Sequence, residues 1–290
     1  MRRFQFPLLA AVAVIGLTSI TQAAAPAPVP VPYGWTGFYA GIEFGGAWSD
    51  QAVNYSPNDP VAAALLSGNG GIGAGEQPVP SGYRISQSGP VGGFEAGYNW
   101  QAGSNWLLGL EADFSFSPMS GRAGGTSIVD AGSVPVDLQT TSAEQSTDWY
   151  GTVRGRAGWL VTPNLLLFGT GGFAFGRVDG SANYMTSFGG VGHSGDVSFE
   201  CPGSGGLCFA GSSSATRTGW TAGGGAEWLL DQHWSAKIEY QIVDLGTEPV
   251  RITALALCTV CGVTTTTPSS FTAAFRDQFN VVRLGLNYRY

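Results

Sequence analysis

Residues 147–161 read TDWYGTVRGRAGWLV, and this stretch alternates apolar and polar side chains with a period of two. One face carries Trp149, Val153, Ala157, Trp159 and Val161, and the other carries Asp148, Tyr150, Thr152, Arg154 and Arg156. A period of two is the spacing of a β-strand whose two faces meet different surroundings. The aromatic and aliphatic face is typical of a strand that contacts lipid on one side only.

The same alternation recurs in eight segments, which cover residues 35–49, 88–101, 105–117, 147–161, 165–179, 215–230, 234–247 and 277–290. Turns of three residues alternate with long connections over 50–87, 118–146, 180–214 and 248–276. This pattern predicts an all-β fold, an eight-stranded antiparallel up-and-down transmembrane β-barrel over residues 35–290 with four long extracellular loops. The alternation does not settle which face of segment 165–179 points outward.

Composition supports a membrane barrel over a soluble domain. Only 11% of the 290 residues are charged, compared with about 25% in a typical soluble domain. Mean hydropathy is only +0.09, and no apolar run reaches the ~18 residues that a spanning helix needs. Without Arg2 and Arg3 the chain keeps 11 basic residues against 20 acidic ones, so nucleic acid is not an expected partner.

The N-terminus has the features of an export signal. Arg2 and Arg3 precede a ten-residue apolar core, Leu8 to Leu17, and small residues follow it. We therefore expect a cleaved signal peptide over residues 1–25 and a proline-rich periplasmic leader over residues 26–34. Export followed by barrel formation predicts location in the cell outer membrane.

The tryptophans lie near the ends of the expected strands. Indole prefers the membrane–water interface, so two aromatic girdles are expected. Trp149 and Trp159 lie ten residues apart on one face, which corresponds to roughly 25 Å along a tilted strand. The expected girdle residues are Trp48, Trp100, Trp106, Trp149, Trp159, Trp220, Trp228 and Trp234.

Four strand motifs resemble those of a known family. They are WTGFYAG at 35–41, WYGTVRGRAGW at 149–159, LFGTGGFAFG at 167–176 and VRLGLNYRY at 282–290. In this order they resemble the small outer-membrane immunogenic-protein and porin-like β-barrel family of Gram-negative bacteria. The resemblance implies that Tyr290 is part of the C-terminal signal read by outer-membrane assembly machinery, and that outer-membrane lipid surrounds the barrel. It implies no catalytic residues and no cofactor.

The inward positions of the strands collect charged residues. The expected polar network of the lumen contains Glu43, Glu95, Glu111, Asp113, Arg154, Arg156, Glu227, Lys237, Glu239, Arg283 and Arg289. An eight-stranded barrel is only wide enough for its own side chains. A plug of ion pairs is one interpretation, and a narrow ion path is the other.

The four cysteines fall in the expected outward loops. Cys201 and Cys208 lie in the third loop, and Cys258 and Cys261 form a C-x-x-C in the fourth. In an exported chain such pairs favour local disulfides, although pairing between the loops is also possible. A redox motif or half of a metal site is an alternative interpretation of the C-x-x-C.

These observations predict a surface-exposed structural protein of the cell envelope that is not an enzyme. A small porin that passes ions or small solutes is the first alternative. A surface binder, for adhesion or for a ligand such as haem, is the second, with His193 and Tyr184 as the residues available in the third loop. A serine–histidine pair could form only around His193 and Ser194, and nothing else supports catalysis there.

Overall fold

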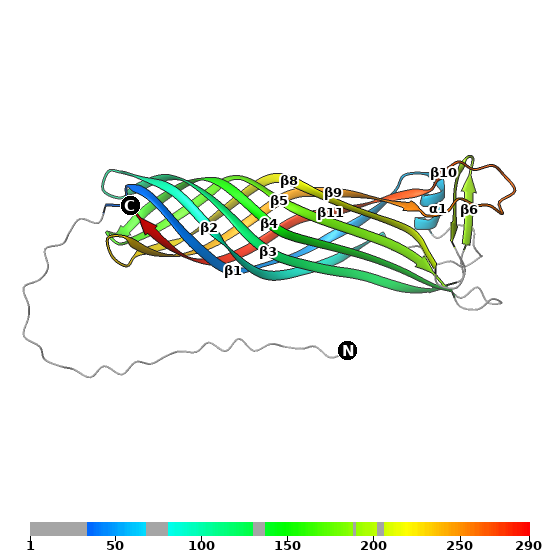
Figure 1. The fold of residues 1–290 in the computed structure, drawn as a ribbon, viewed down its shortest axis with the longest axis horizontal. Coiled ribbons are helices and arrows are strands. Elements are labelled where there is room, and N and C mark those ends of the chain that lie inside the picture. Colours follow the sequence, from blue (N-terminus) through cyan, green and yellow to red (C-terminus); the bar gives the residue numbers. More distant parts are fainter. Residues whose placement is uncertain (1–33, 68–80, 130–136, 188–189, 202–205) are drawn as a thin grey trace, which may run out of the picture. The chain divides into compact units, whose positions relative to one another are not determined.

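A computed structural model describes residues 34–67, 81–129, 137–187, 190–201 and 206–290. Eight long antiparallel strands form a closed barrel in the order β1-β11-β9-β8-β5-β4-β3-β2 (Figure 1). They are β1 (Gly37–Pro57), β2 (Gly82–Ala102), β3 (Trp106–Val129), β4 (Asp137–Thr162), β5 (Leu165–Thr186), β8 (Gly206–Leu229), β9 (Trp234–Ala254) and β11 (Ser270–Arg289). The predicted eight-stranded barrel is confirmed. The expected signal peptide and nearly all of the expected leader lie outside the described residues.

The strands continue well beyond the expected ends, so the four outward connections are shorter than predicted. Along the strands, the apolar side chains also move from the lipid-facing side to the interior side, as β11 shows. On β11, Val282 and Leu284 are exposed on either side of the buried Arg283, whereas farther out Phe275 is buried and Arg276 is exposed. Beyond the lipid the outer face meets water and the interior packs as an apolar core. Beyond the lipid, the inward residues are therefore apolar and the outward ones polar, the reverse of the pattern used to recognise the strands. For this reason the sequence pattern did not predict the strand extensions.

A bulge in β4 is a further difference between the expected and the observed strands. The register between β4 and its neighbours shifts between Thr147 and Trp149. The extra residue places Asp148 on the exposed side, although its sequence position predicts the inward face. On β5, whose facing the sequence left open, Leu166 and Phe168 point inward and Leu167 points outward.

The end of the barrel that carries the long connections, which we call the outward end, is filled by an apolar core. Its core residues include Val53, Phe209 and Phe275. Helix α1 (Pro60–Ser67) adds three side chains to this core, those of Val61, Ala62 and Leu65. Asp59 fixes the helix: its Oδ1 accepts a hydrogen bond from Ala62 N (2.9 Å), and its Oδ2 accepts one from Ser270 N of β11 (2.7 Å). No helix among the described residues is long and apolar enough to cross a membrane.

A small second sheet lies among the outward connections. It contains β6 (Gly190–Ser194), β7 (Val197–Cys201) and β10 (Thr267–Pro268), in the order β10-β7-β6. The structure joins Cys201 to Cys208 and Cys258 to Cys261, so both disulfides are local: the first links the end of β7 to the start of β8, and the second lies between β9 and β10. Figure 1 shows β6, β10 and α1 together at the end of the barrel opposite the C-terminus.

Candidate functional site

The candidate site is a layer of charged side chains that crosses the barrel interior. We call it the charged layer; its members are Glu43, Glu95, Glu111, Asp113, Arg154, Arg156, Glu227, Lys237, Glu239 and Arg283. Each residue is at most 6% exposed. They come from seven strands, and β5 contributes Thr170, so every strand of the barrel reaches the layer. A glycine at position 285 leaves room for it, because a Cβ there would lie 3.2 Å from Lys237 Cε.

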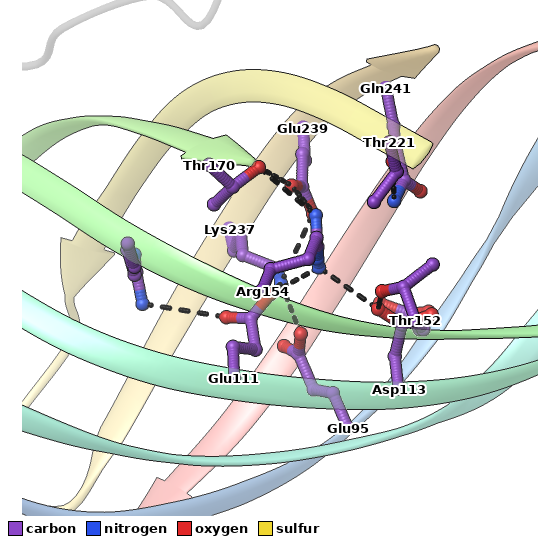
Figure 2. A network of polar contacts seen from close by, with 12 residues as sticks. Glu95, Glu111, Asp113, Thr152, Arg154, Thr170, Thr221, Lys237, Glu239 and Gln241 are labelled. Atoms are coloured by element: carbon purple, nitrogen blue, oxygen red, sulfur yellow. Dashed lines mark hydrogen bonds and ion pairs between the residues drawn. The ribbon is translucent and has the colours of Figure 1, made fainter. Parts of the chain in front are cut away.

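Arg154 is the most highly connected base of the layer (Figure 2). Its guanidinium pairs with Glu111 and Glu239, and its Nη2 lies 3.0 Å from Asp113 Oδ2. The Arg154 Nη1 also donates a hydrogen bond to Thr170 Oγ1 (3.1 Å). One side chain of β4 is thereby linked to β3, β5 and β9.

Arg283 and Lys237 extend these links to the remaining side of the ring. Arg283 pairs with Glu43, and its Nη2 lies 2.9 Å from Glu239 Oε2 and 3.4 Å from Asp113 Oδ2. Lys237 pairs with Glu95, and its Nζ lies 3.4 Å from Glu239 Oε2. Acids on facing strands therefore share the same bases, which holds a buried charge cluster together.

Arg156 continues the layer toward the short turns. It pairs with Glu227, and its Nη1 lies 3.7 Å from Glu111 Oε2. Its guanidinium also lies over the ring of Phe168, 4.0 Å from the centroid. Tyr39 donates a hydrogen bond to Glu111 Oε2 (2.5 Å). Sequence reasoning missed Tyr39, although it occupies the same alternating face of β1 as Glu43.

The layer contains six acids and four bases, so acids are in excess by two. Three carboxylate oxygens lack a hydrogen-bond partner among the described residues: Glu43 Oε2, Glu95 Oε1 and Asp113 Oδ1. Arg154 Nε and Arg156 Nε also lack a partner there, but each of the four bases contacts two or more carboxylates. The bases are therefore the limiting component of the layer.

Apolar side chains close the interior on both sides of the layer. On the short-turn side lies a cluster of Trp35, Leu107, Leu160, Leu166, Phe168 and Leu229. On the other side lies a cluster that includes Met119, Tyr150 and Phe279. Charged side chains between two apolar plugs leave the lumen filled at three successive levels.

Arg289 points inward but lies apart from the charged layer, contrary to expectation. Its guanidinium lies 5.0 Å from the ring centroid of Trp35, and its Nη2 donates a hydrogen bond to Gly34 O (2.7 Å). No carboxylate among the described residues lies within ion-pair distance of it. Arg289 lies nearer to the short turns than the charged layer does. It therefore contacts Trp35 of the apolar cluster on that side instead of an acid.

The eight expected girdle tryptophans all lie on the outer surface in two groups. The lower group, beside the short turns, contains Trp100, Trp106, Trp159, Trp228 and Trp234. The upper group contains Trp48, Trp149 and Trp220. Between the two groups, no charged side chain of the described strands points outward. The surface between them includes the exposed Leu110, Phe94 and Ile238.

The residues proposed for a surface ligand do not gather in one loop. Tyr184 is buried in the outer core and packs against Phe209 with ring centroids 6.0 Å apart, whereas His193 is exposed on β6. Tyr290 is exposed at the C-terminus, and its N donates a hydrogen bond to Phe38 O (3.0 Å). In the described part of the chain, no group of three or more His, Cys, Asp or Glu side chains is placed to hold a metal ion.

Comparisons with known proteins agree with the barrel. The family described as outer membrane protein beta-barrel domain matches residues 10–289. The 31 kDa outer-membrane immunogenic proteins of Brucella melitensis biotype 1 and Brucella suis biovar 1 are each 30% identical over 291 residues, which covers 98% of both chains. A 22 kDa outer membrane protein of Rhizobium leguminosarum bv. viciae is 29% identical over 51% of this chain and 49% of its own.

The solved structures that are similar to the chain include the following two. The outer membrane protein OprG of Pseudomonas aeruginosa has a TM-score of 0.40 at 11% identity, covering 90% of this chain and 99% of its own. The attachment invasion locus protein Ail of Yersinia pestis has a TM-score of 0.32 at 12% identity, covering 88% and 99%.

Proposed function

Because this chain belongs to the outer membrane protein β-barrel domain family, we propose that it is a plugged, non-conducting outer-membrane barrel. Its role is to strengthen the cell envelope and to present its outward end at the cell surface. The observation that carries this proposal is the charged layer, whose side chains from seven strands fill the lumen together with Thr170 of the eighth. We propose no catalytic role.

The plugged lumen is favoured over a pore by the density of its contacts. A conducting path needs polar groups that stay hydrated, whereas the layer residues are buried and bound to one another. Buried charges are stable only when they are paired and hydrogen-bonded. Moving an ion through would separate these pairs and then cross both apolar clusters.

Single-channel conductance of the refolded protein in a planar bilayer tests the plug. A known porin serves as the positive control. Heat-modifiable migration, which is the change in migration of the protein on an SDS gel after boiling, verifies that the inserted protein is folded. We expect no conductance steps from the folded protein in the bilayer. Discrete conductance steps that change in R154Q or E111Q would overturn the proposal in favour of a small porin, because both residues lie in the charged layer.

The outward end is built for presentation rather than for catalysis. Two disulfides close its connections, and Asp59 anchors α1 to β11. The name of the Brucella relatives, outer-membrane immunogenic protein, supports a surface-exposed role. We propose that this end is reached by molecules outside the cell.

Surface labelling tests the orientation of the barrel. Lys237 is the only lysine and it is buried, so an introduced lysine is a selective target for an amine reagent that cannot cross membranes. Val260 is 71% exposed on the outward end, and Ser104 is exposed in a short turn. We expect V260K to be labelled on intact cells and S104K only after the cells are broken. The reverse result would contradict the proposed orientation.

A further inference from the structure

The basic residues of the barrel occupy only two places. From residue 34 onward there are eleven, and five of them point into the interior: Arg154, Arg156, Lys237, Arg283 and Arg289. The other six are all arginines on the outward half of the strands: Arg84, Arg122, Arg177, Arg217, Arg251 and Arg276. Acids, in contrast, continue into the outward connections, for example at Asp59, Asp196 and Glu200. Solubility alone does not explain why the outer arginines are restricted to the outward half of the strands while acids also occur in the connections.

Strand register places these arginines just beyond the upper tryptophan group. Arg177 is paired directly with Trp149, and Arg84 is paired with Ala52, four residues beyond Trp48. Arg276 lies four residues beyond Asn280, the residue paired with Trp48. A tilted strand rises about 2.5 Å per residue along the barrel axis.

Arg122 and Arg251 complete the band. Arg122 is paired with Glu144, five residues beyond Trp149, and Arg251 is paired with Thr272, four residues beyond Arg276. The arginines therefore span the level from the upper tryptophans to roughly 20 Å beyond them. The lower part of this range is at the depth of lipid headgroups next to an apolar band that ends in interfacial tryptophans.

Five of the six point away from the barrel, and we call them the arginine collar: Arg84, Arg122, Arg177, Arg251 and Arg276. Their strands are β2, β3, β5, β9 and β11, so the collar extends around the barrel. The side chains of Arg84 and Arg122 are both 68% exposed. Arg217 is left out because it is partly turned inward, where its Nη1 lies 3.0 Å from Glu248 Oε2.

The collar arginines keep donors available for an external anion. Four of them have a carboxylate neighbour on the barrel, such as Asp50 at 3.0 Å from Arg84 and Glu144 at 2.8 Å from Arg122. Exposed pairs of this kind are worth little and exchange readily. Arg251 contacts Ser270 Oγ (2.9 Å) and has no carboxylate within ion-pair distance among the described residues.

We propose that the arginine collar binds phosphate groups of the lipopolysaccharide that forms the outer leaflet of the outer membrane. Guanidinium groups bind phosphate in a bidentate manner, which suits a phosphate site to the arginine that occupies every collar position. The collar begins where the apolar band ends, so a lipid whose acyl chains contact the band places its headgroup phosphates at this level. The carboxylate neighbours hold the guanidinium groups in place until phosphate competes for them.

The test compares two double variants with opposite charge changes. R122Q/R251Q removes two collar cations, whereas D50N/E144Q removes two of their carboxylate neighbours and frees Arg84 and Arg122. Both variants are exposed at the changed positions, and heat-modifiable migration verifies folding. Binding of the detergent-solubilised full barrel to immobilised lipopolysaccharide is measured, with dephosphorylated lipopolysaccharide, phosphatidylglycerol and inorganic phosphate as separate probes.

We expect R122Q/R251Q to bind lipopolysaccharide about tenfold more weakly than the wild type, and D50N/E144Q to bind at least as tightly. Dephosphorylation should abolish the difference between the variants. Unchanged binding by R122Q/R251Q, or an equal loss in D50N/E144Q, would overturn the proposal. The same arginine-dependent binding to phosphatidylglycerol or to inorganic phosphate would overturn its assignment to lipopolysaccharide.

Discussion

Gln145 Nε2 donates a hydrogen bond to Asp277 Oδ1 across 2.5 Å, which links β4 to β11 on opposite sides of the ring. Asp277 lies three residues beyond Asn280, the partner of Trp48, and therefore outside the lipid-facing band. Burial raises the pKa of Asp277 to about 7, although the hydrogen bond from Gln145 opposes the rise, and the nearby Glu248 charge adds to it. The second oxygen of Asp277 has no hydrogen-bond partner among the described residues.

This raised pKa predicts that the barrel loses stability as the pH rises. The folded protein holds the Asp277 proton up to about pH 7, whereas the unfolded chain releases it near pH 4. Stability from this group is therefore complete below about pH 4 and is lost by about pH 7. D277N should remove this decline and be more stable than the wild type at pH 8 by a few kcal/mol. Urea unfolding of the refolded barrel from pH 4 to 8 measures it.

Asp148 provides the control for this prediction. It is an exposed acid close to the same level of the barrel, because the bulge in β4 turns it outward. D148N should keep the pH dependence of the wild type. If D277N keeps it as well, the proton on Asp277 is not its source.

The charged layer should tolerate the loss of an acid better than the loss of a base. In R283Q, carboxylates of Glu43, Asp113 and Glu239 lose a shared partner, and about 3–5 kcal/mol of stability should be lost. In E95Q, Lys237 keeps Glu111 at 3.5 Å and Glu239 at 3.4 Å. The loss should then be about 1 kcal/mol or less. Equal losses in urea unfolding of the two variants would contradict the excess of acids.

A charge in the lipid-facing band should be costly. Leu110 is 68% exposed on β3 between the two tryptophan groups. L110R should reduce the free energy of unfolding in lipid vesicles by ~2–4 kcal/mol, because the guanidinium is placed in hydrocarbon. Ser120 points away from the barrel on the same strand, four residues beyond Phe116, the partner of Trp149, so S120R should change the free energy of unfolding by less than about 0.5 kcal/mol. Similar costs at both positions would mean that the band is misplaced.

The two disulfides should leave no free thiol in the unreduced protein. Thiol labelling under denaturing conditions should therefore give no product, and peptide mapping should recover Cys201 with Cys208 and Cys258 with Cys261. Reduction should leave heat-modifiable migration intact, because the barrel wall is closed by strand pairing and not by these bonds. A peptide that joins Cys201 to Cys258 would contradict the pairing within each connection.

The sequence revealed the membrane-spanning part of the fold because lipid imposes a strict rule on it. Where one face meets hydrocarbon, every second side chain must be apolar, and segments such as 147–161 show that period directly. The outward extensions were missed because the rule inverts there. The buried Val53 and Tyr55 already show the inverted phase, so a search for a change of phase beyond Trp48 would have extended β1.

Sequence alone therefore determined the number of strands, the two tryptophan groups and the ten members of the charged layer. Each of these depends on alternation along a single strand. Only the tertiary structure decided that Arg154 reaches Glu239, that Arg289 joins Trp35 instead of an acid, and that five arginines form a collar. These relationships join strands that are distant in sequence. They depend on the register and tilt of the closed barrel, which set the height at which each side chain meets its neighbours.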